Sequence, residues 1–364
     1  MVETVRQMVE IESPSDNKQA VDRLGRWLAQ KFDALGGHSK FHRAADFGDH
    51  LQVDFPGPGR RQPVLLLGHI DTVYPLGTLA KMSCHNSGGR LYGPGTLDMK
   101  AGIAQMLFAI DALRTQDGNL PRPVTVLLVT DEEVGSTSSR RITEEVAKRS
   151  GAVLVLEPSF GPKGAVKTAR KGVGEYLLKV TGKSAHAGLD FDQGQSAILE
   201  LAHQILGISK LTDRKRGLTV SVGLVSGGTR VNVIPAEATA SIDVRVVHMA
   251  DAKAIDRKLR TLKPVNRKCR LELTGGVDRP PMERGPGVAA LYKQAVTLAK
   301  QIGWKLDEAA VGGGSDGNLT AALGIPTLDG LGGVGEGAHA AHESIVIDEL
   351  PRRTALLAGL IESV

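Results

Sequence analysis

Three short apolar runs in the first half of the chain lack a helical period, and each leads into polar residues. The runs cover residues 63–68, 124–130 and 152–156. Runs of this kind predict strands that are buried on both faces of a parallel sheet. They are followed by His69 and Asp71, by Asp131-Glu132-Glu133, and by Glu157. Because the carboxyl ends of parallel strands meet at one edge of a sheet, we expect these side chains to lie close together.

Apolar residues at helical spacing flank these runs and predict the surrounding helices. Helices are expected near residues 1–12, 21–35, 103–113, 287–302 and 349–361, with a last strand at 324–328. The stretch Ser13-Pro14-Ser15 separates the first two helices. Alternating strands and helices indicate an α/β fold with a mixed, mostly parallel sheet flanked by helices.

The pattern changes after Pro158. Residues 175–181, 218–225 and 238–246 alternate between apolar and polar positions, which is typical of half-solvated antiparallel strands. Helical patterns at 194–208 and 250–262 accompany them. We therefore expect an inserted α+β domain at 164–276, while residues 1–163 and 277–364 form the first domain. Two domains are also the natural expectation for 364 residues.

Composition excludes several classes of protein. No apolar segment approaches the roughly 20 residues that cross a bilayer, and the N-terminus lacks the pattern of a signal peptide, so we expect a cytoplasmic protein. The net charge of +5 comes from scattered basic residues, which argues against a nucleic-acid partner. Cys84 and Cys269 are isolated, so no disulfide framework is indicated.

The carboxylates expected at the sheet edge would repel one another without a cation between them. The candidates are His69, Asp98, Glu132, Glu133, Glu157 and a late histidine, His339 or His342. Nitrogen and carboxylate ligands without thiolates suit Zn²⁺, with Co²⁺ or Mn²⁺ as substitutes. Two histidines and three carboxylates exceed the needs of one four-coordinate catalytic ion, but they fit two ions that share a bridging carboxylate.

Each residue also has a plainer interpretation. A single histidine at a strand end is more often structural, and Asp98 precedes a helix, where an aspartate commonly serves as N-cap. Of the pair Glu132-Glu133, one carboxylate can face a metal while its neighbour takes a proton from water. Asp71 can hold the second ring nitrogen of His69. The conjunction of these residues, rather than any one of them, predicts the metal site.

Three motifs carry a family resemblance: residues 68–72 (GHIDT), 93–102 (GPGTLDMKAG) and 131–136 (DEEVGS). They closely resemble the dizinc metallopeptidase family of glutamate carboxypeptidase, aminoacylase, acetylornithine deacetylase and succinyl-diaminopimelate desuccinylase. The glutamate carboxypeptidase branch is the most similar, partly because Glu157 stands where aminopeptidase members commonly have aspartate. The resemblance implies a zinc-peptidase fold and a metallopeptidase or amidohydrolase activity.

The resemblance also implies roles for the residues of the first domain. One zinc would be bound by His69 and Glu157, the other by Glu133 and His339, and Asp98 would bridge them. Glu132 would be the general base and Asp71 the orienting partner. A cis peptide would follow Asp98, and His342 is the alternative to His339.

The inserted domain resembles the lid of this family, which also forms a homodimer contact. His186, in the motif at residues 182–188, would polarise the scissile carbonyl or hold the oxyanion, within its own subunit or across the dimer. Asn232 and Arg245 would anchor the substrate, since an arginine forks onto a carboxylate in a way that lysine cannot. Gly314 can present a backbone N–H to a substrate oxygen. A surface histidine and a plain tight turn are the plainer interpretations of His186 and Gly314.

These expectations converge on hydrolysis of an amide bond next to a free carboxylate, in a peptide or an N-acyl amino acid. The nearest alternative is a deacylase of the acetylornithine or succinyl-diaminopimelate type. A non-catalytic binder on the same fold is a further possibility, although the presence of Glu132 with every implied ligand argues against it. An exopeptidase that recognises a free amine instead of a carboxylate is the third.

Overall fold

The computed structural model describes residues 1–59, 61–117 and 119–364, and the chain forms two compact units. The main unit comprises residues 1–169, 284–310 and 315–364. The inserted unit comprises residues 170–283 and 311–314. The boundaries expected at 164 and 276 fall a few residues early, and the second one cuts through strand β12 (Arg270–Arg279). Gly275 and Gly276 interrupt the alternating pattern of this strand, which hides it in the sequence.

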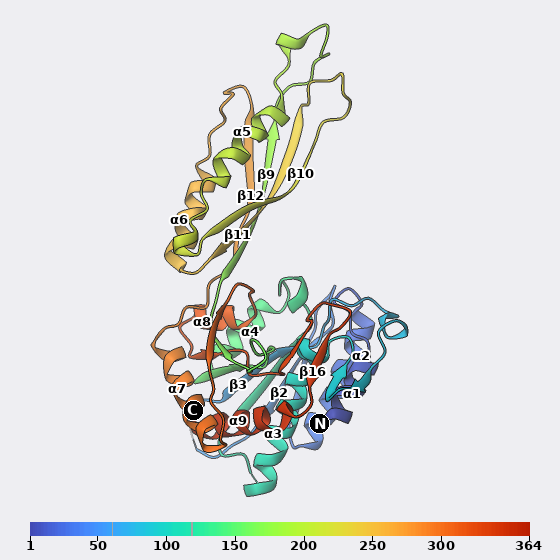
Figure 1. Cartoon of the computed structure of the whole chain (residues 1–364), viewed down its shortest axis with the longest axis vertical. Helices are drawn as coiled ribbons and strands as arrows, with labels where there is room; N and C mark the ends of the chain where they lie inside the picture. The colour runs from blue at the N-terminus through green and yellow to red at the C-terminus, as the bar shows by residue number, and fades with distance from the viewer. Residues whose placement is uncertain (60, 118) are drawn as a thin grey trace. The chain divides into compact units, whose positions relative to one another are not determined.

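The main unit is built on a six-stranded sheet with the order β1-β2-β6-β3-β7-β14 (Figure 1). Its strands are β1 (His38–His42), β2 (His50–Phe55), β3 (Val64–His69), β6 (Val124–Val129), β7 (Ala152–Val155) and β14 (Thr327–Leu328). The last four are parallel, with Leu66 of β3 opposite Val126 and Leu154, whereas β1 and β2 run antiparallel at one edge. The prediction of a mixed, mostly parallel sheet is confirmed.

Helices cover both faces of this sheet. They are α1 (Val2–Glu10), α2 (Lys18–Ala34), α3 (Ala101–Asp117), α4 (Arg140–Ala147), α7 (Pro286–Gln301), α8 (Gly317–Ala322) and α9 (Glu349–Ser363). Successive strand residues point to opposite faces. Val64 and Leu66 therefore pack with α1, α2, α3, α7 and α9, while Leu65 and Leu67 pack with α4 on the other face. Burial on both faces explains the continuous apolar runs of the central strands.

Shorter strands complete the main unit. Strands β4 (His85–Ser87), β5 (Arg90–Tyr92), β15 (Gly335–Glu336) and β16 (Ser344–Val346) form a sheet with the order β15-β16-β5-β4, and β8 (Val166–Arg170) pairs with β13 (Glu308–Val311). Pairing of β16 with β5 joins the C-terminal part of the chain to the segment that precedes residues 93–102. Two segments far apart in the sequence are thereby held side by side.

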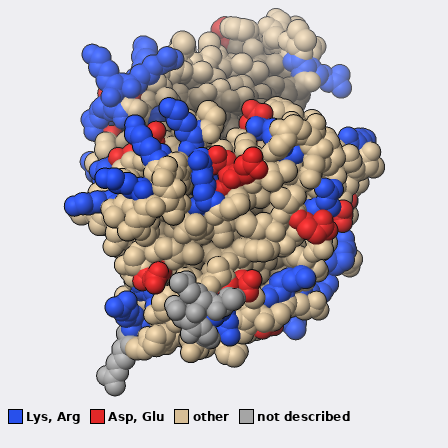
Figure 2. Space-filling model, turned by 60° about the horizontal axis from the view of Figure 1, so that its bottom comes forward, with Lys and Arg blue, Asp and Glu red and all other residues tan. Residues whose placement is uncertain are grey.

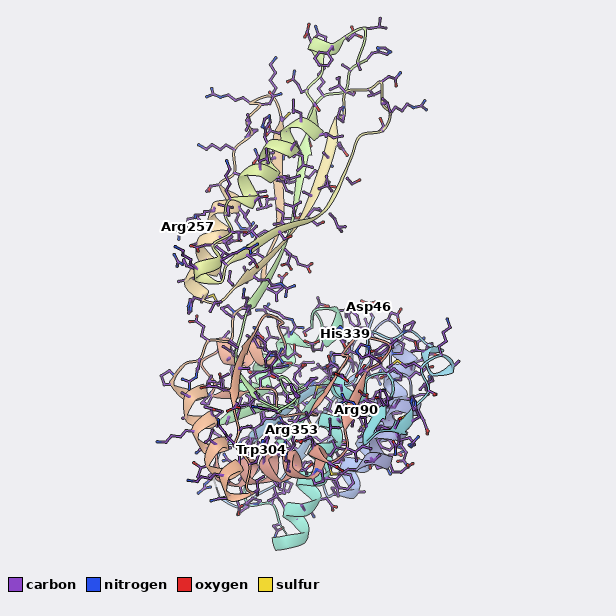
Figure 3. All side chains as sticks on the ribbon, in the orientation of Figure 1. Asp46, Arg90, Arg257, Trp304, His339 and Arg353 are labelled. Atoms are coloured by element: carbon purple, nitrogen blue, oxygen red, sulfur yellow. The ribbon has the colours of Figure 1, made fainter. Side chains whose placement is uncertain are left out.

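A buried arginine on α9, Arg353, fixes the loop after β14 (Figure 3). Its guanidinium donates hydrogen bonds to the carbonyl oxygens of Gly330 and Leu331. The same loop returns to the central sheet, where the Gly332 amide donates to the Glu157 carbonyl at 2.8 Å. The end of β7 is therefore held by main-chain bonds that are fixed from α9.

The inserted unit is a four-stranded antiparallel sheet with two helices on one face (Figure 1). The strand order is β10 (Thr219–Gly227), β11 (Glu237–Val246), β9 (Gly172–Thr181) and β12, and the helices are α5 (Ala197–Ser209) and α6 (Met249–Arg260). On β9, Tyr176 and Leu178 are buried beneath the helices whereas Leu177 is exposed. The alternating pattern of the sequence matches this one-sided burial.

Charged residues are mixed on the face of the molecule shown in Figure 2, where carboxylates lie among lysine and arginine side chains. This distribution agrees with the scattered basic residues of the sequence. Within the described residues, no helix combines the length and apolar character needed to cross a membrane. The cytoplasmic location expected from the sequence stays a prediction.

Candidate metal centre

The carboxyl ends of three parallel strands bring four of the predicted residues together. His69 is the last residue of β3, Glu132 and Glu133 follow β6, and Glu157 follows β7. His69 is almost fully buried, and its Nε2 lies 3.6 Å from Glu157 Oε1. Glu132 is half-buried, and one of its carboxylate oxygens lies within 4.8 Å of a donor atom of each of these two residues. The register of the sheet thus produces the cluster that the three apolar runs predict.

Asp98 lies between two histidines. Its Oδ1 is 3.1 Å from His69 Nε2, and its Oδ2 is 3.4 Å from His339 Nε2. On the far side, His339 Nε2 is 3.0 Å from Glu133 Oε2. Each oxygen of Asp98 therefore belongs to a different group of donor atoms, which is the arrangement of a bridging carboxylate.

The donor atoms fit two small divalent ions. Ligand atoms held at about 2.0–2.1 Å from a tetrahedral ion lie about 3.3 Å from one another. The pairs His69–Asp98, His69–Glu157, His339–Asp98 and His339–Glu133 are separated by 3.1, 3.6, 3.4 and 3.0 Å. The donors are imidazole nitrogens and carboxylate oxygens, a set that suits Zn²⁺, Co²⁺ or Mn²⁺.

The loop that carries Asp98 requires special backbone geometry. Gly95 has a left-handed φ of 72°, and a Cβ at this position would lie 2.8 Å from the Thr72 side chain, so only glycine fits. The Asp98–Met99 peptide bond is cis, as the family resemblance implies. Asp98 itself has extended φ and ψ angles and precedes the first residue of α3, Ala101, by three positions.

His339 also has unusual backbone angles. Its φ of 63° is in the left-handed region, which a residue with a side chain adopts at a cost and which is often found at functional sites. Both late histidines are exposed, but His339 lies against Asp98 and Glu133, whereas the His342 ring lies against Gly337 of the same loop. The geometry therefore favours His339 as the late histidine.

The carboxylates of the cluster create a negative potential that favours positive charge on its neighbours. Burial alone would lower the pKa of His69, but hydrogen bonds to Asp71 and Asp98 raise it well above its usual value. Hydrogen bonds to Asp98 and Glu133 raise the pKa of His339 to about 10. Burial opposes ionisation of Asp98, yet its hydrogen bonds to the two histidines hold its pKa well below the usual range. Without a cation, protons on the imidazoles balance the carboxylates.

Asp71 contacts the second ring nitrogen of His69 and several further groups. His69 Nδ1 lies 3.0 Å from the main-chain carbonyl oxygen of Asp71 and 3.5 Å from its carboxylate. The carboxylate also accepts the backbone N–H groups of Glu132 and Glu133 at 3.3 and 3.2 Å. It also accepts the hydroxyl of Ser15 at 2.7 Å, a contact that no local pattern in the sequence signals. Asp71 thus contacts His69 through its main chain and its carboxylate, and the carboxylate also holds the backbone of the two glutamates.

The predicted residues of the inserted unit lie on exposed segments. His186 is exposed, and its Nδ1 accepts hydrogen bonds from the N–H groups of Gly188 and Leu189, both at 3.1 Å. A neutral His186 therefore carries its proton on Nε2 and can donate from it. The Ala187 amide donates to the carbonyl oxygen of Asn232 at 3.0 Å, so the segments of His186 and Asn232 are neighbours.

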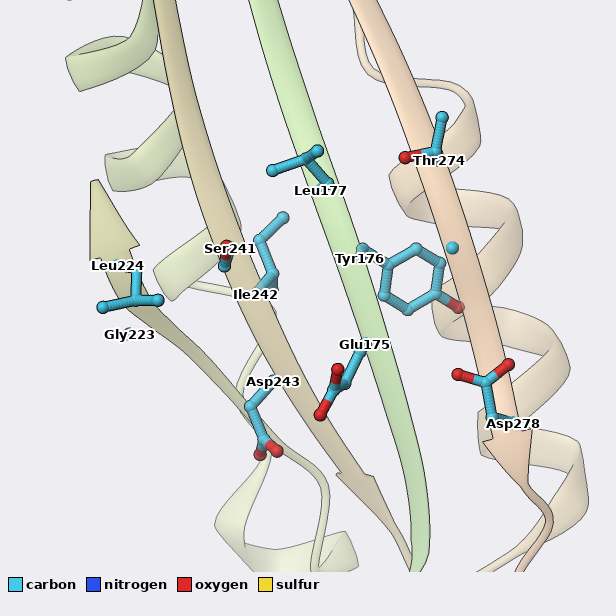
Figure 4. Close-up of a pocket in the computed structure, with 11 residues that line it drawn as sticks. Glu175, Tyr176, Leu177, Gly223, Leu224, Ser241, Ile242, Asp243, Thr274 and Asp278 are labelled. Atoms are coloured by element: carbon cyan, nitrogen blue, oxygen red, sulfur yellow. The ribbon is translucent and has the colours of Figure 1, made fainter. Parts of the chain in front are cut away.

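Arg245 is already paired within its own strand. Its Nε and Nη2 atoms donate to the Asp243 carboxylate at 2.8 to 3.1 Å. Asp243 borders a hollow of about 570 Å³ on the exposed face of the sheet, together with Glu175 and Leu177 (Figure 4). This hollow is built entirely from the inserted unit and contains none of the predicted metal ligands. A substrate carboxylate would have to share the Arg245 guanidinium with Asp243.

The glycine-rich loop at residues 312–316 turns its carbonyl oxygens towards an arginine. Gly313 and Gly314 accept hydrogen bonds from Arg170 Nη1 at 3.2 and 3.1 Å. The Ser315 amide donates to Asn318 Oδ1 at 3.0 Å. The role expected for the Gly314 N–H group stays a prediction.

A mostly parallel sheet with a cluster of imidazole and carboxylate donors at its carboxyl edge, and a glutamate beside them, defines a metal-dependent hydrolase. Comparison with protein families agrees, since the model of Peptidase family M20/M25/M40 matches residues 65–363. The chain belongs to this family of metallopeptidases.

Individual relatives are similar over the full length of the chain. It is 30% identical to Carboxypeptidase G2 of Pseudomonas sp. over 99% of this chain and 88% of the relative. Its fold resembles the aminopeptidase PepT from Bacillus cereus, with a TM-score of 0.81, 23% identity, and coverage of 100% and 98% of the two chains. A Bacillus subtilis protein described as a dinuclear metal binding peptidase has a TM-score of 0.73 at 16% identity, covering 99% of this chain and 96% of its own.

Proposed function

We propose that this protein is a two-zinc carboxypeptidase that hydrolyses an amide bond next to a free carboxylate, in the manner of a glutamate carboxypeptidase. The observation that carries the proposal is the position of Asp98, with one carboxylate oxygen beside His69 and the other beside His339. The similarity to Carboxypeptidase G2 over almost the whole chain supports the carboxypeptidase assignment. One ion would be held by His69 and Glu157, and the other by Glu133 and His339.

The side chains supply the remaining steps. When bound, a pair of divalent ions lowers the pKa of a water molecule towards about 7 and polarises the scissile carbonyl. Glu132 accepts the proton of the attacking water and returns it to the leaving amine. Asp71 holds the backbone of Glu132 and Glu133 in place. His186 donates from Nε2 to the oxygen that becomes negative in the transition state.

The test is metal analysis combined with a panel of substrates. Purified protein loaded with Zn²⁺ should contain two ions per chain and should cleave acyl-glutamates faster than acetyl- or succinyl-amino acids. Faster cleavage of the acetyl or succinyl compounds would make the protein a deacylase instead. Cleavage of peptides that have a free amine but a blocked carboxylate would contradict the carboxylate requirement. Binding of acyl-amino acids without any hydrolysis would indicate a non-catalytic binder.

We also propose that the protein is a homodimer joined through the inserted unit. Strand β10 is an edge strand. Its residue Val220 pairs with the Thr212 hydroxyl, and the outer edge beyond Val220 can extend the sheet into a second copy. Large apolar side chains are exposed on β10 and on the neighbouring helix α5, namely Leu224, Val225, Ile198, Leu199 and Leu206. Light scattering should give the mass of two chains, and Leu206→Glu should shift it towards one. A monomeric parent protein would contradict the proposal.

A further inference from the structure

A fully buried carboxylate outside the predicted ligand set, Glu343, contacts the loop that carries Asp98. Glu343 Oε1 accepts the backbone N–H groups of Leu97 and Asp98 at 2.8 and 2.9 Å. Its Oε2 accepts the N–H group of Gly95 at 3.0 Å and the Tyr74 hydroxyl at 2.6 Å. Four donors therefore converge on one carboxylate, and each of its two oxygens accepts two of them.

Glu343 belongs to the same loop as His339. The two residues are four positions apart, and the Glu343 amide donates to the Ala340 carbonyl oxygen at 3.0 Å. The Tyr74 hydroxyl also lies 3.0 Å from that carbonyl oxygen. Glu343 consequently connects the backbone of Asp98 to the turn that presents His339, although the two segments are more than 240 positions apart in the sequence.

Local packing needs do not explain a carboxylate at this position. A buried ionisable group is costly unless it is fully hydrogen-bonded, and a neutral side chain could satisfy only part of this donor set. The three backbone N–H groups belong to a segment that lies ahead of α3 and has no helical partners for them. A carboxylate is the side chain that can accept all four donors at once.

We propose that Glu343 is a positioning residue that sets the distance between Asp98 and His339, and with it the geometry of the second metal ion. This inference rests on the proposed two-metal function. Replacing a residue that hydrogen-bonds to a metal ligand and orients it typically lowers metal affinity or activity about 10–100-fold. Glu343 contacts the backbone around Asp98 and the turn of His339 and is not among the proposed ligands, so we expect it to act through Asp98 and His339.

The variant Glu343→Gln tests this assignment. Glutamine keeps the shape of the side chain but has one acceptor oxygen, so it can bind only one of the two donor pairs. With Co²⁺ as the probe, the visible absorption spectrum and the stoichiometry of binding report on each ion directly. We expect the second Co²⁺ to bind at least about 10-fold more weakly with an altered spectrum. We also expect kcat to fall while KM changes less than about twofold, because substrate contacts are intact.

Matched variants separate positioning from general destabilisation. Glu336→Gln changes the charge of an exposed residue on the adjoining strand β15 and should leave the Co²⁺ spectrum unchanged. Tyr74→Phe removes one of the four donors and should give a weaker effect than Glu343→Gln. If Glu343→Gln does not fold, Tyr74→Phe must still alter the Co²⁺ spectrum for the proposal to stand.

The outcomes distinguish this inference from the proposed function. A wild-type protein that binds fewer than two Co²⁺ ions would overturn the two-metal function itself. Two ions in the wild type with unchanged Co²⁺ affinity and spectrum in Glu343→Gln would overturn the positioning role alone, even if that variant melted at a lower temperature. An effect of Tyr74→Phe as large as that of Glu343→Gln would also contradict it, because the backbone contacts of Glu343 would then be dispensable.

Discussion

The predicted functional residues of the two units are held in contrasting ways. In the main unit, His69 and Asp71 are 2% and 0% exposed and each makes several hydrogen bonds, and the half-exposed His339 side chain lies against Asp98 and Glu133. In the inserted unit, His186 is exposed, and Arg245 is held by a carboxylate of its own strand. The side chains of the main unit are held in place before any ligand binds. Those of the inserted unit must exchange a hydrogen-bond partner or lose bound water when a substrate binds.

This difference follows from the chemistry of each task. Metal ligands must converge within a few tenths of an ångström, and a low-dielectric surrounding strengthens their attraction for a cation. Groups that bind a substrate must instead admit and release it, which requires exposed side chains. Substitutions in the main unit should therefore remove turnover, and substitution of Arg245 in the inserted unit should chiefly weaken substrate binding.

The largest effect is expected for Glu132→Gln. The amide cannot take a proton from water, so kcat should fall by about 10²–10⁴-fold while both metal ions remain bound. Steady-state kinetics and metal analysis on the same preparation measure the two quantities. Glu145→Gln, on the exposed side of α4, is the control and should behave like the wild type. Full turnover in Glu132→Gln would exclude it as the general base.

The second-largest effect should distinguish His339 from His342. His339→Ala should lose one of two Zn²⁺ ions and at least about 100-fold in kcat, because a direct ligand matters at least as much as the groups behind it. His342→Ala should retain both ions and most of the activity. Metal content after dialysis measures the difference, and the reverse result would transfer the ligand role to His342.

A smaller effect is expected in the inserted unit. Arg245→Ala removes hydrogen bonds to a charged group worth about 1.5–3 kcal/mol, so KM for substrates with a free carboxylate should rise roughly 10–100-fold. Arg245→Lys keeps the positive charge but cannot make the two parallel hydrogen bonds of a guanidinium. Its KM should therefore lie between those of the wild type and Arg245→Ala. Initial rates with a free and an amidated substrate carboxylate test this. An unchanged KM in Arg245→Ala would show that another group reads the carboxylate.

The smallest expected effect is a pH-dependent change in the stability of the metal-free protein. The carboxylates of Asp98 and Glu133 raise the pKa of His339 to about 10, so protonated His339 stabilises the folded metal-free chain. This stabilisation is complete below the usual histidine pKa of about 6.5 and is lost as pH rises to about 10. The melting temperature of metal-free protein should decline over this range, and His339→Ala should flatten the decline. Metal binding should instead strengthen with rising pH, because protons compete for the same nitrogens.

Much of the fold could be predicted because its central strands are apolar on both faces. Residues 63–68, 124–130 and 152–156 needed only their composition to be recognised as β3, β6 and β7. The edge strand β1 has the polar sequence His38-Ser39-Lys40-Phe41-His42, which resembles a loop until it pairs with β2. Strand β14 is only two residues long, although residues 324–328 were expected to form it.

The donor residues of the site could be predicted because each follows a recognisable strand or loop. The groups that hold them could not. Ser15 reaches Asp71 from 56 positions away, and Tyr74 reaches Glu343 from 269 positions away. Such contacts exist only after the sheet has brought distant segments together, so a local pattern carries no signal for them. Asp243 differs from these residues, because it lies two positions before Arg245 on β11, where alternation places both side chains on one face.

The central claim is that two cations share Asp98. Anomalous diffraction from crystals of the Zn²⁺-loaded protein, recorded on both sides of the zinc edge, tests it most directly. We predict two peaks about 3.5–4 Å apart, one beside His69 and Glu157 and the other beside Glu133 and His339, with Asp98 between them. A single peak, or two peaks that do not share Asp98, would contradict it.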